Sequence, residues 1–143
     1  MSNELIDKAT GRYLPIRYPE EAPYWDGAQQ GKLVLQECED CGKTWFPIGP
    51  TCPHCLSSNF QWKQMSGLGT ISNVVIFHKG WTPYLNSKTP YAVVQVELDE
   101  GPRITANFVG EKVTAENIGV PVEAVWEKIN EEISLVQFKS RAS

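Results

Sequence analysis

The sequence predicts a mainly β protein in three parts: an N-terminal arm with a short helix (residues 1–31), a small cysteine module (32–62) and a five-stranded barrel (63–143). Two observations lead to this prediction. All four cysteines lie in two C-x-x-C pairs between residues 38 and 55, and the apolar side chains after residue 63 alternate with polar ones over several short runs. Such alternation is typical of strands that bury one face.

Composition and charge narrow the class of protein. At 143 residues and 41% hydrophobic content, the chain can form one domain with a core. No apolar run approaches the ~20 residues of a membrane span, and the first residues lack the pattern of a secretory signal, so we expect a cytoplasmic protein. The net charge is −4, and only residues 63–110 carry more basic than acidic side chains. This balance argues against a nucleic-acid partner, because phosphate neutralisation supplies most of the affinity of such binders.

The N-terminal arm is expected to be irregular and to end in a short helix near "PYWDGAQQGK" (23–32). Pro23 suits a first helical turn, and Gly31 suits the position after the last. The arm could dock on a partner, which we favour because aromatic residues are enriched in interfaces, or it could be a strap packed across the chain's own ribbon or barrel. The aromatic residues concerned are Tyr13, Tyr18, Tyr24 and Trp25.

The cysteine module begins with the strand-like run "KLVLQE" (32–37) and is too small to bury a core of its own. Modules below ~40 residues usually need a metal or disulfides. A C-x-x-C turn directs two sulfurs at one ion, and two such turns on adjacent hairpins form a rubredoxin-like zinc ribbon. Gly42 supports this prediction, because a tight knuckle often needs a positive φ after its second cysteine. The predicted ligands of one structural zinc ion are Cys38, Cys41, Cys52 and Cys55.

Other uses of the four thiols are less consistent with the sequence. A redox dithiol needs a C-x-x-C at a helix start in an α/β setting, whereas the flanking pattern is strand-like. Two disulfides would suit a secreted protein. Catalytic zinc keeps a position open for water, whereas four cysteines close the shell. His54 could replace one cysteine as a ligand, and iron could occupy the sulfur site as in rubredoxin.

The barrel is predicted from five strand-like runs, at residues 67–78, 91–99, 103–110, 120–129 and 133–138. The first run is long and begins with glycines that permit bending, and the only helical signal is a turn near "TAENIG". Five strands with a long, curving first one best match an OB-fold barrel. The side chains expected to face its core are Ala92, Val94, Val96, Leu98, Ile104, Ala106, Phe108, Val122, Ala124 and Trp126.

The sequence contains no recognisable catalytic constellation. Acyl transfer needs an activated nucleophile, a base and donors for the oxyanion, and all four thiols are assigned to the metal. No G-x-S-x-G, H-E-x-x-H or phosphate-cradling glycine loop occurs. His78 could act as a base, but a lone histidine at a strand end is more often a simple polar partner. We therefore expect no activity from the chain alone.

A succession of segments resembles a known family: "YWDGAQQGKLVLQECEDCGKTWFP", "CPHC", "GLGTISN", "TPYAVVQVELDEGPRITANFVG" and "IGVPVEAVWE". Together these resemble the acyl-CoA-associated zinc-ribbon/OB-fold proteins over about residues 22–138. The resemblance implies a non-catalytic subunit that accompanies thiolase-fold enzymes, hydroxymethylglutaryl-CoA synthases or hydratases. It implies a hetero-oligomeric thiolase-type acyltransferase complex acting on a β-ketoacyl-CoA, with aromatic or dicarboxylic acyl groups as possible substrates.

The resemblance also bears on CoA contacts. Family members often carry "FPPR" after the first knuckle, whereas this chain has "FPIGP" (46–50), so an arginine that could meet a phosphate is missing there. The segment 78–91 is expected to be the loop between the first two barrel strands, where binding residues concentrate. Its aromatic side chains could stack on adenine or a partner, or could cover the barrel end while the lysines are solvated. The candidate CoA or partner contacts are Lys79, Trp81, Tyr84, Lys88 and Arg103.

Two other functions remain open from the sequence alone. One is a free-standing acyl-CoA-binding module. The other is a nucleic-acid-binding zinc ribbon and OB-fold, which the acidic balance disfavours.

Overall fold

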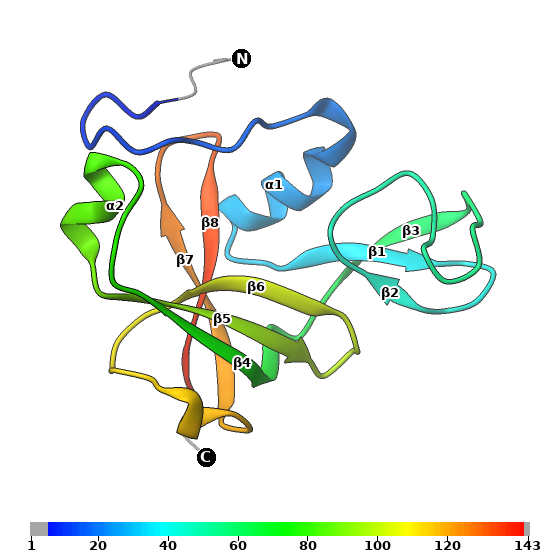
Figure 1. The fold of residues 1–143 in the computed structure, drawn as a ribbon. Helices are drawn as coiled ribbons and strands as arrows, with labels where there is room; N and C mark the ends of the chain where they lie inside the picture. The colour runs from blue at the N-terminus through cyan, green and yellow to red at the C-terminus, as the bar shows by residue number, and fades with distance from the viewer. Residues whose placement is uncertain (1–5, 142–143) are drawn as a thin grey trace.

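The computed structural model describes residues 6–141 and confirms the mainly β architecture. A three-stranded sheet and a closed five-stranded barrel lie next to each other, and helix α1 (Ala22–Gln29) lies near both (Figure 1). Neither α-helix in residues 6–141 is long and apolar enough to cross a membrane.

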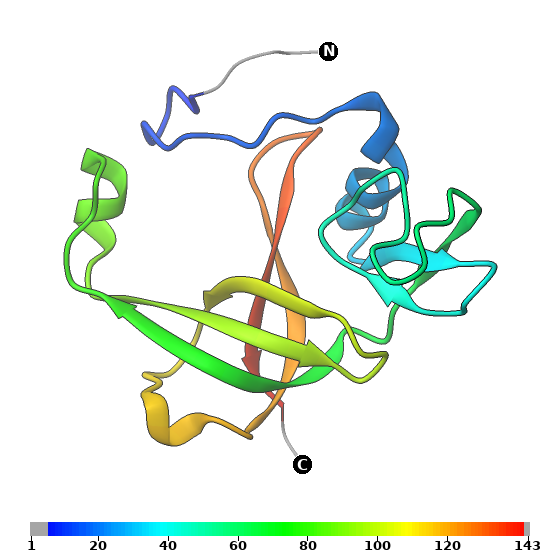
Figure 2. The same cartoon turned by 45° about the vertical axis from the view of Figure 1, so that its right-hand side comes forward.

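The N-terminal arm crosses the β7–β8 end of the barrel, between α2 and α1 (Figure 2). It is held by two arginines. The Arg12 guanidinium donates to Glu127 at 2.9 Å and lies 4.7 Å from the centre of the Tyr84 ring. The Arg17 guanidinium donates to the carbonyl oxygen of Glu132 at 3.0 Å. The arm is therefore a strap across the barrel, as one of the two interpretations from the sequence expected.

Of the four aromatic residues of the arm, two are buried in the core and two are exposed. After the short 3₁₀ turn η1 (Pro19–Glu21), the chain enters α1, where Tyr24 and Trp25 are each only 8% exposed and belong to the main core. Their rings meet edge to face at 5.1 Å. The expectation that these two residues form docking surface is wrong, because the helix turns them onto the core. Tyr13 and Tyr18 remain exposed.

The cysteine module contains three antiparallel strands in the order β2-β1-β3. These are β1 (Val34–Cys38), β2 (Thr44–Trp45) and β3 (Phe60–Gln64). The central strand β1 pairs with both neighbours, and β3 continues past residue 62, where the sequence predicts the module to end. The rings of Trp45, Phe60 and Trp62 meet edge to face, and Trp45 and Phe60 pack with Cys38 and Cys52.

The barrel has the order β4-β5-β6-β8-β7 and is closed by pairing of β4 with β7. Its strands are β4 (Leu68–Phe77), β5 (Tyr91–Leu98), β6 (Arg103–Phe108), β7 (Pro121–Lys128) and β8 (Ser134–Ser140). All pairs are antiparallel except β6 with β8. The side chains predicted to face the core are either buried in it or packed against it. A 3₁₀ turn, η2 (Ala115–Asn117), lies where the sequence predicts one, and the five-stranded barrel prediction is confirmed.

Helix α2 (Pro83–Lys88) was not predicted from the sequence, which indicated only a loop. The Thr82 hydroxyl accepts a hydrogen bond from the Leu85 N–H at 3.2 Å, and Pro83 occupies the first turn. Both are ordinary signals of a helix start. Gly80 packs so closely on this helix that a Cβ there would lie 2.1 Å from the backbone nitrogen of Asn86.

The connection between the two sheets is residues 65–67. Each of its residues is hydrogen-bonded to a different part of the structure, and the Met65 side chain is buried. The bonds run from the Met65 N–H to the Leu33 carbonyl at 2.7 Å, from the Ser66 N–H to the Glu100 carboxylate at 2.7 Å, and from the Ala124 N–H to the Gly67 carbonyl at 2.8 Å. The sheets are thus joined by a short, fixed segment.

Candidate metal centre and surface sites

The two C-x-x-C turns have the same local geometry. Cys38 ends β1, and the N–H of Gly42 returns to its carbonyl at 2.9 Å. In the second turn, the N–H of Leu56 returns to the Cys52 carbonyl at 2.8 Å. The residue after each pair has a positive φ, 77° at Gly42 and 65° at Leu56. The glycine predicted for the first knuckle is therefore matched by a strained leucine in the second, because L-residues disfavour this conformation.

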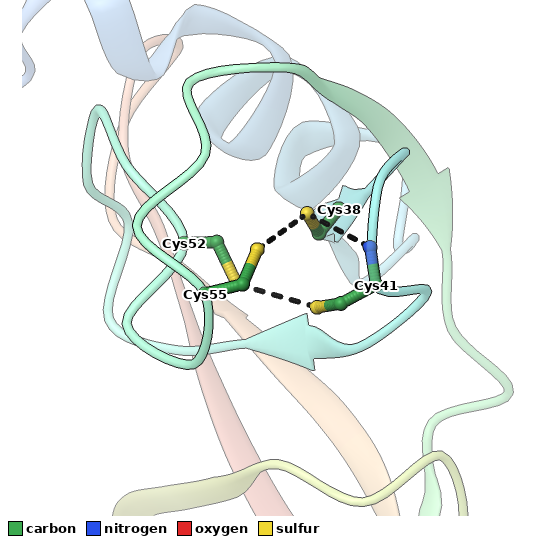
Figure 3. A group of neighbouring side chains, drawn as sticks. All are labelled: Cys38, Cys41, Cys52 and Cys55. Carbon is green, nitrogen blue, oxygen red and sulfur yellow. Dashed lines mark hydrogen bonds between the residues drawn. The ribbon is translucent and has the colours of Figure 1, made fainter.

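The four sulfurs converge on one point (Figure 3). All four Sγ atoms lie within 4.8 Å of one another; the Sγ atoms of Cys38 and Cys55 are 3.5 Å apart and those of Cys41 and Cys52 are 3.7 Å apart. Four sulfurs ~2.3 Å from one tetrahedral ion lie ~3.8 Å from each other. The residues present therefore fit a tetrathiolate metal site. His54 is not in this group of ligand atoms; its side chain is exposed, and its backbone N–H donates to the Cys52 sulfur at 3.4 Å.

Electrostatics within the cluster favour ionisation of one thiol in particular. The backbone N–H of Cys41 donates to the Cys38 sulfur at 3.4 Å and is the main cause that lowers the pKa of Cys38 to about 7. At Cys55, the Ser57 N–H acts to lower the pKa, but the neighbouring thiols, Cys38 first, and burial outweigh it and raise the pKa to about 12. Crowded thiols cannot all ionise next to one another, whereas a bound cation makes all four thiolates favourable.

The loop "FPIGP" is held to the sheet by a buried glutamine. The Gln36 side chain, 1% exposed, donates from Nε2 to the Gly49 carbonyl at 2.7 Å and accepts from the Gly49 N–H at 2.9 Å. This contact could not be predicted from the sequence, because the partner of Gln36 lies 13 residues further along the chain.

The predicted CoA or partner contacts fall into two places. Lys79 lies 4.8 Å from the centre of the Trp81 ring, and Lys88 lies 5.6 Å from that of Tyr84, so these four residues gather around α2. Arg103 lies apart from them. It lies opposite Glu97 in the strand register, near the far end of β5, and the strand rise places it ~20 Å from the loop.

His78 is exposed and lines a separate cavity of about 490 Å³ with Tyr91, Phe108 and Lys112. Its side chain makes no hydrogen bond or ion pair within residues 6–141. The pairing of a base with a nucleophile that acyl transfer requires is not formed here by the described side chains.

Comparison with known proteins gives consistent matches. The model of the ChsH2 rubredoxin-like zinc ribbon domain matches residues 25–61, and that of the ChsH2 C-terminal OB-fold domain matches residues 62–127. A probable enoyl-CoA hydratase alpha subunit of Thermomonospora curvata is 33% identical over 128 residues, which are 90% of this chain but only 40% of that protein. A DUF35 domain-containing scaffold protein of Methanocaldococcus jannaschii is 33% identical over 70% of this chain and 71% of its own length. A solved structure described as Ltp2-ChsH2(DUF35) aldolase matches with a TM-score of 0.76 and 32% identity, over 89% of this chain and 98% of that chain.

Proposed function

Because the chain belongs to the family of ChsH2-like DUF35 zinc-ribbon and OB-fold proteins, we propose that it is a non-catalytic scaffold subunit of a hetero-oligomeric complex acting on CoA thioesters. The partner in this proposal is a thiolase-fold enzyme, and the substrate is a β-ketoacyl-CoA, with aromatic and dicarboxylic acyl groups as candidates. Two relatives are called a hydratase alpha subunit and an aldolase. These names support a second candidate, in which the partner is a hydratase or an aldolase.

The observation that carries the proposal is an exposed aromatic and apolar surface on the arm and the loop 78–91. We call it the arm–loop surface. Its members, with their exposed fractions, are Tyr13 (64%), Ile16 (48%) and Trp81 (79%). Tyr18 (52%) is also exposed, but it lies at the ribbon end of the arm, where it lines a cavity with Gln36 and Phe60. Arg12 joins the two segments, because it contacts the Tyr84 ring from the arm. Large aromatic side chains exposed in this way are typical of protein interfaces, where they supply much of the binding energy.

The charges on the loop support a protein partner at this surface. The ammonium groups of Lys79 and Lys88 lie against the rings of Trp81 and Tyr84, which stabilises the arrangement by cation–π attraction. Rings and lysines held in one arrangement present a preformed surface, and a preformed surface binds with a smaller entropic cost.

The four cysteines are assigned one structural zinc ion. Bound zinc would supply folding free energy to a module too small to be stable without it. Cys52→Ser is expected to lose zinc, measured by atomic absorption, together with soluble yield. His54→Ala is the matched control and should retain one zinc per chain, because His54 lies outside the sulfur cluster. A Cys52→Ser protein that folds without metal would refute the structural assignment.

The scaffold proposal is tested by co-expression with thiolase-fold, hydratase and aldolase subunits from the same genome. We expect a stable heteromer with one of them in light scattering after size exclusion, and activity that neither chain has alone. Trp81→Ala should weaken the heteromer about 30-fold, as an interface hot spot of about 2 kcal/mol would. Leu56→Ala is the control, because Leu56 is also exposed, at 78%, but lies on the second knuckle. Full partner activity with no association would exclude the proposal.

The two remaining alternatives have their own signatures. A free-standing acyl-CoA-binding module would bind acyl-CoA in calorimetry and form no heteromer. A nucleic-acid-binding protein would bind single strands with a steep salt dependence.

A further inference from the structure

A cleft lies between the cysteine module and the barrel, and no part of the proposed scaffold function uses it. Its volume is about 820 Å³, within the range of small-molecule sites. One wall comes from the first knuckle, β2 and the start of the second knuckle, and the other comes from the β5–β6 hairpin. A molecule bound here would contact both modules at once.

Two side chains that carry positive charge line this cleft. Lys43 follows the first knuckle, and Arg103 begins β6 on the opposite wall. Both are exposed, and neither makes a side-chain hydrogen bond or ion pair within residues 6–141. The cleft therefore presents two unpaired cationic donors in a chain whose net charge is −4. They are well suited to an anion.

The acidic groups nearby reduce this potential only in part. Glu100 also lines the cleft, but its carboxylate accepts hydrogen bonds from the Ser66 N–H at 2.7 Å and from the Ser66 hydroxyl at 3.3 Å. Glu97 lies opposite Arg103 in the strand register, without an ion pair between them. The donors of Lys43 and Arg103 thus remain available to a ligand.

Five other lining residues are apolar and carry rings: Trp45, Phe46, Pro47, Pro53 and Pro102. Thr44, Gln95 and Thr105 add polar groups to the lining. Trp45 is 4% exposed, and its buried indole N–H has no acceptor within the described residues. The cleft therefore combines a flat apolar wall with unpaired donors at its edge, which fits a ligand that has an apolar body and an anionic end.

We propose that this cleft binds an organic phosphate, that is, a phosphate group attached to an aromatic or flat apolar body as in a nucleotide. Arg103 and Lys43 hold the phosphate from opposite walls, and the half-buried Phe46 with the exposed Pro47 and Pro53 holds the body. The guanidinium suits this role because its planar fork matches two phosphate oxygens. Such chemistry could come from a free nucleotide or from the nucleotide end of CoA.

The test is calorimetry on the full-length, zinc-loaded chain without any partner, so that its result is separate from that of the heteromer assay. ADP is the first probe and should bind with a stoichiometry of one. Arg103→Gln and Lys43→Gln should each weaken binding about tenfold, as expected for loss of one charged hydrogen bond. Lys112→Gln is the matched control; it removes the same charge from a residue that lines the separate cavity next to His78 and should leave the affinity unchanged.

Further probes distinguish the ligand class and its source. Inorganic phosphate should bind more weakly than ADP, because it lacks a body for the apolar wall. CoA that binds more tightly than ADP would identify CoA as the source, and equal binding would identify a free nucleotide. Absence of ADP binding at millimolar concentration, equal affinity for ADP and inorganic phosphate, or an equal loss in Lys112→Gln would each overturn the proposal. The zinc content of each variant verifies that it is folded.

Discussion

Replacing Gln36 with leucine is expected to lower the free energy of unfolding by about 2 kcal/mol. The side chain is 1% exposed and makes two hydrogen bonds to the backbone of Gly49, at 2.7 and 2.9 Å. Each neutral hydrogen bond contributes about 1 kcal/mol net, and leucine has a similar volume but cannot form either. Gly49 is half-buried, so water can replace part of the lost bonding and the cost stays near the lower end of the usual range.

Urea unfolding of the zinc-loaded chain measures this change. With a slope of ~1.5 kcal/mol per molar urea, a loss of about 2 kcal/mol shifts the midpoint by ~1.3 M. Gln61→Leu is the matched control on the neighbouring strand, because Gln61 is exposed and its one side-chain bond, to Glu37 at 3.1 Å, lies at the surface. Its effect should stay within about 0.5 kcal/mol. If the two variants shift the midpoint equally, the Gln36 contact does not hold the loop as described.

Three further changes test other features. Leu56→Gly should raise the free energy of unfolding by up to about 1 kcal/mol because it removes a positive φ from a leucine, whereas Gly42→Ala should lower it by about 1 kcal/mol; changes of the same sign would contradict the matching of the two knuckles. Hydrogen bonds, from Lys63 first, lower the pKa of Glu37 below 4.5, so the stability they contribute is present above that pH and is lost as the pH falls through the folded pKa. Glu37→Gln should therefore lower the melting temperature at pH 7, and the difference should shrink as the pH falls below 4.5; a difference that does not change with pH would exclude the ion pair as the cause. Gly80→Ala should cost about 1–3 kcal/mol in the same unfolding assay, because its Cβ would overlap the backbone of α2; an unchanged midpoint would show that the loop can move away.

Local patterns explain why much of this fold could be predicted. Alternation along β5 indicated that Val94, Val96 and Leu98 share a buried face, and all three are buried. The spacing of the cysteines indicated one tetrahedral site, and the four sulfurs converge as expected. Both predictions depend on period or spacing within a short stretch of chain, which the backbone geometry then fixes.

The features that were missed depend on contacts between distant parts of the chain. Tyr24 and Trp25 were placed on the surface because their partners come from the ribbon and the barrel together. The cleft was missed because Lys43 and Arg103 approach each other only when the two sheets are placed side by side. Helix α2 is different, since the pair Thr82 and Pro83 was a local signal that could have predicted it.

The hydrogen-bonded connection at residues 65–67 has a consequence for engineering. If the segment were a flexible linker, the ribbon could be exchanged for that of a relative as an independent unit. Because residues 65–67 are hydrogen-bonded to both sheets, a ribbon whose contacts at this segment differ would disrupt those bonds. A chimera should therefore take Leu33 and Met65, which are hydrogen-bonded to each other, from the same parent. It should keep Glu100 and Ala124 from the parent that supplies the barrel, because these residues hydrogen-bond Ser66 and Gly67. With such a graft, a surface built on the ribbon keeps a defined orientation relative to the barrel, because the hydrogen-bonded segment joins the two sheets.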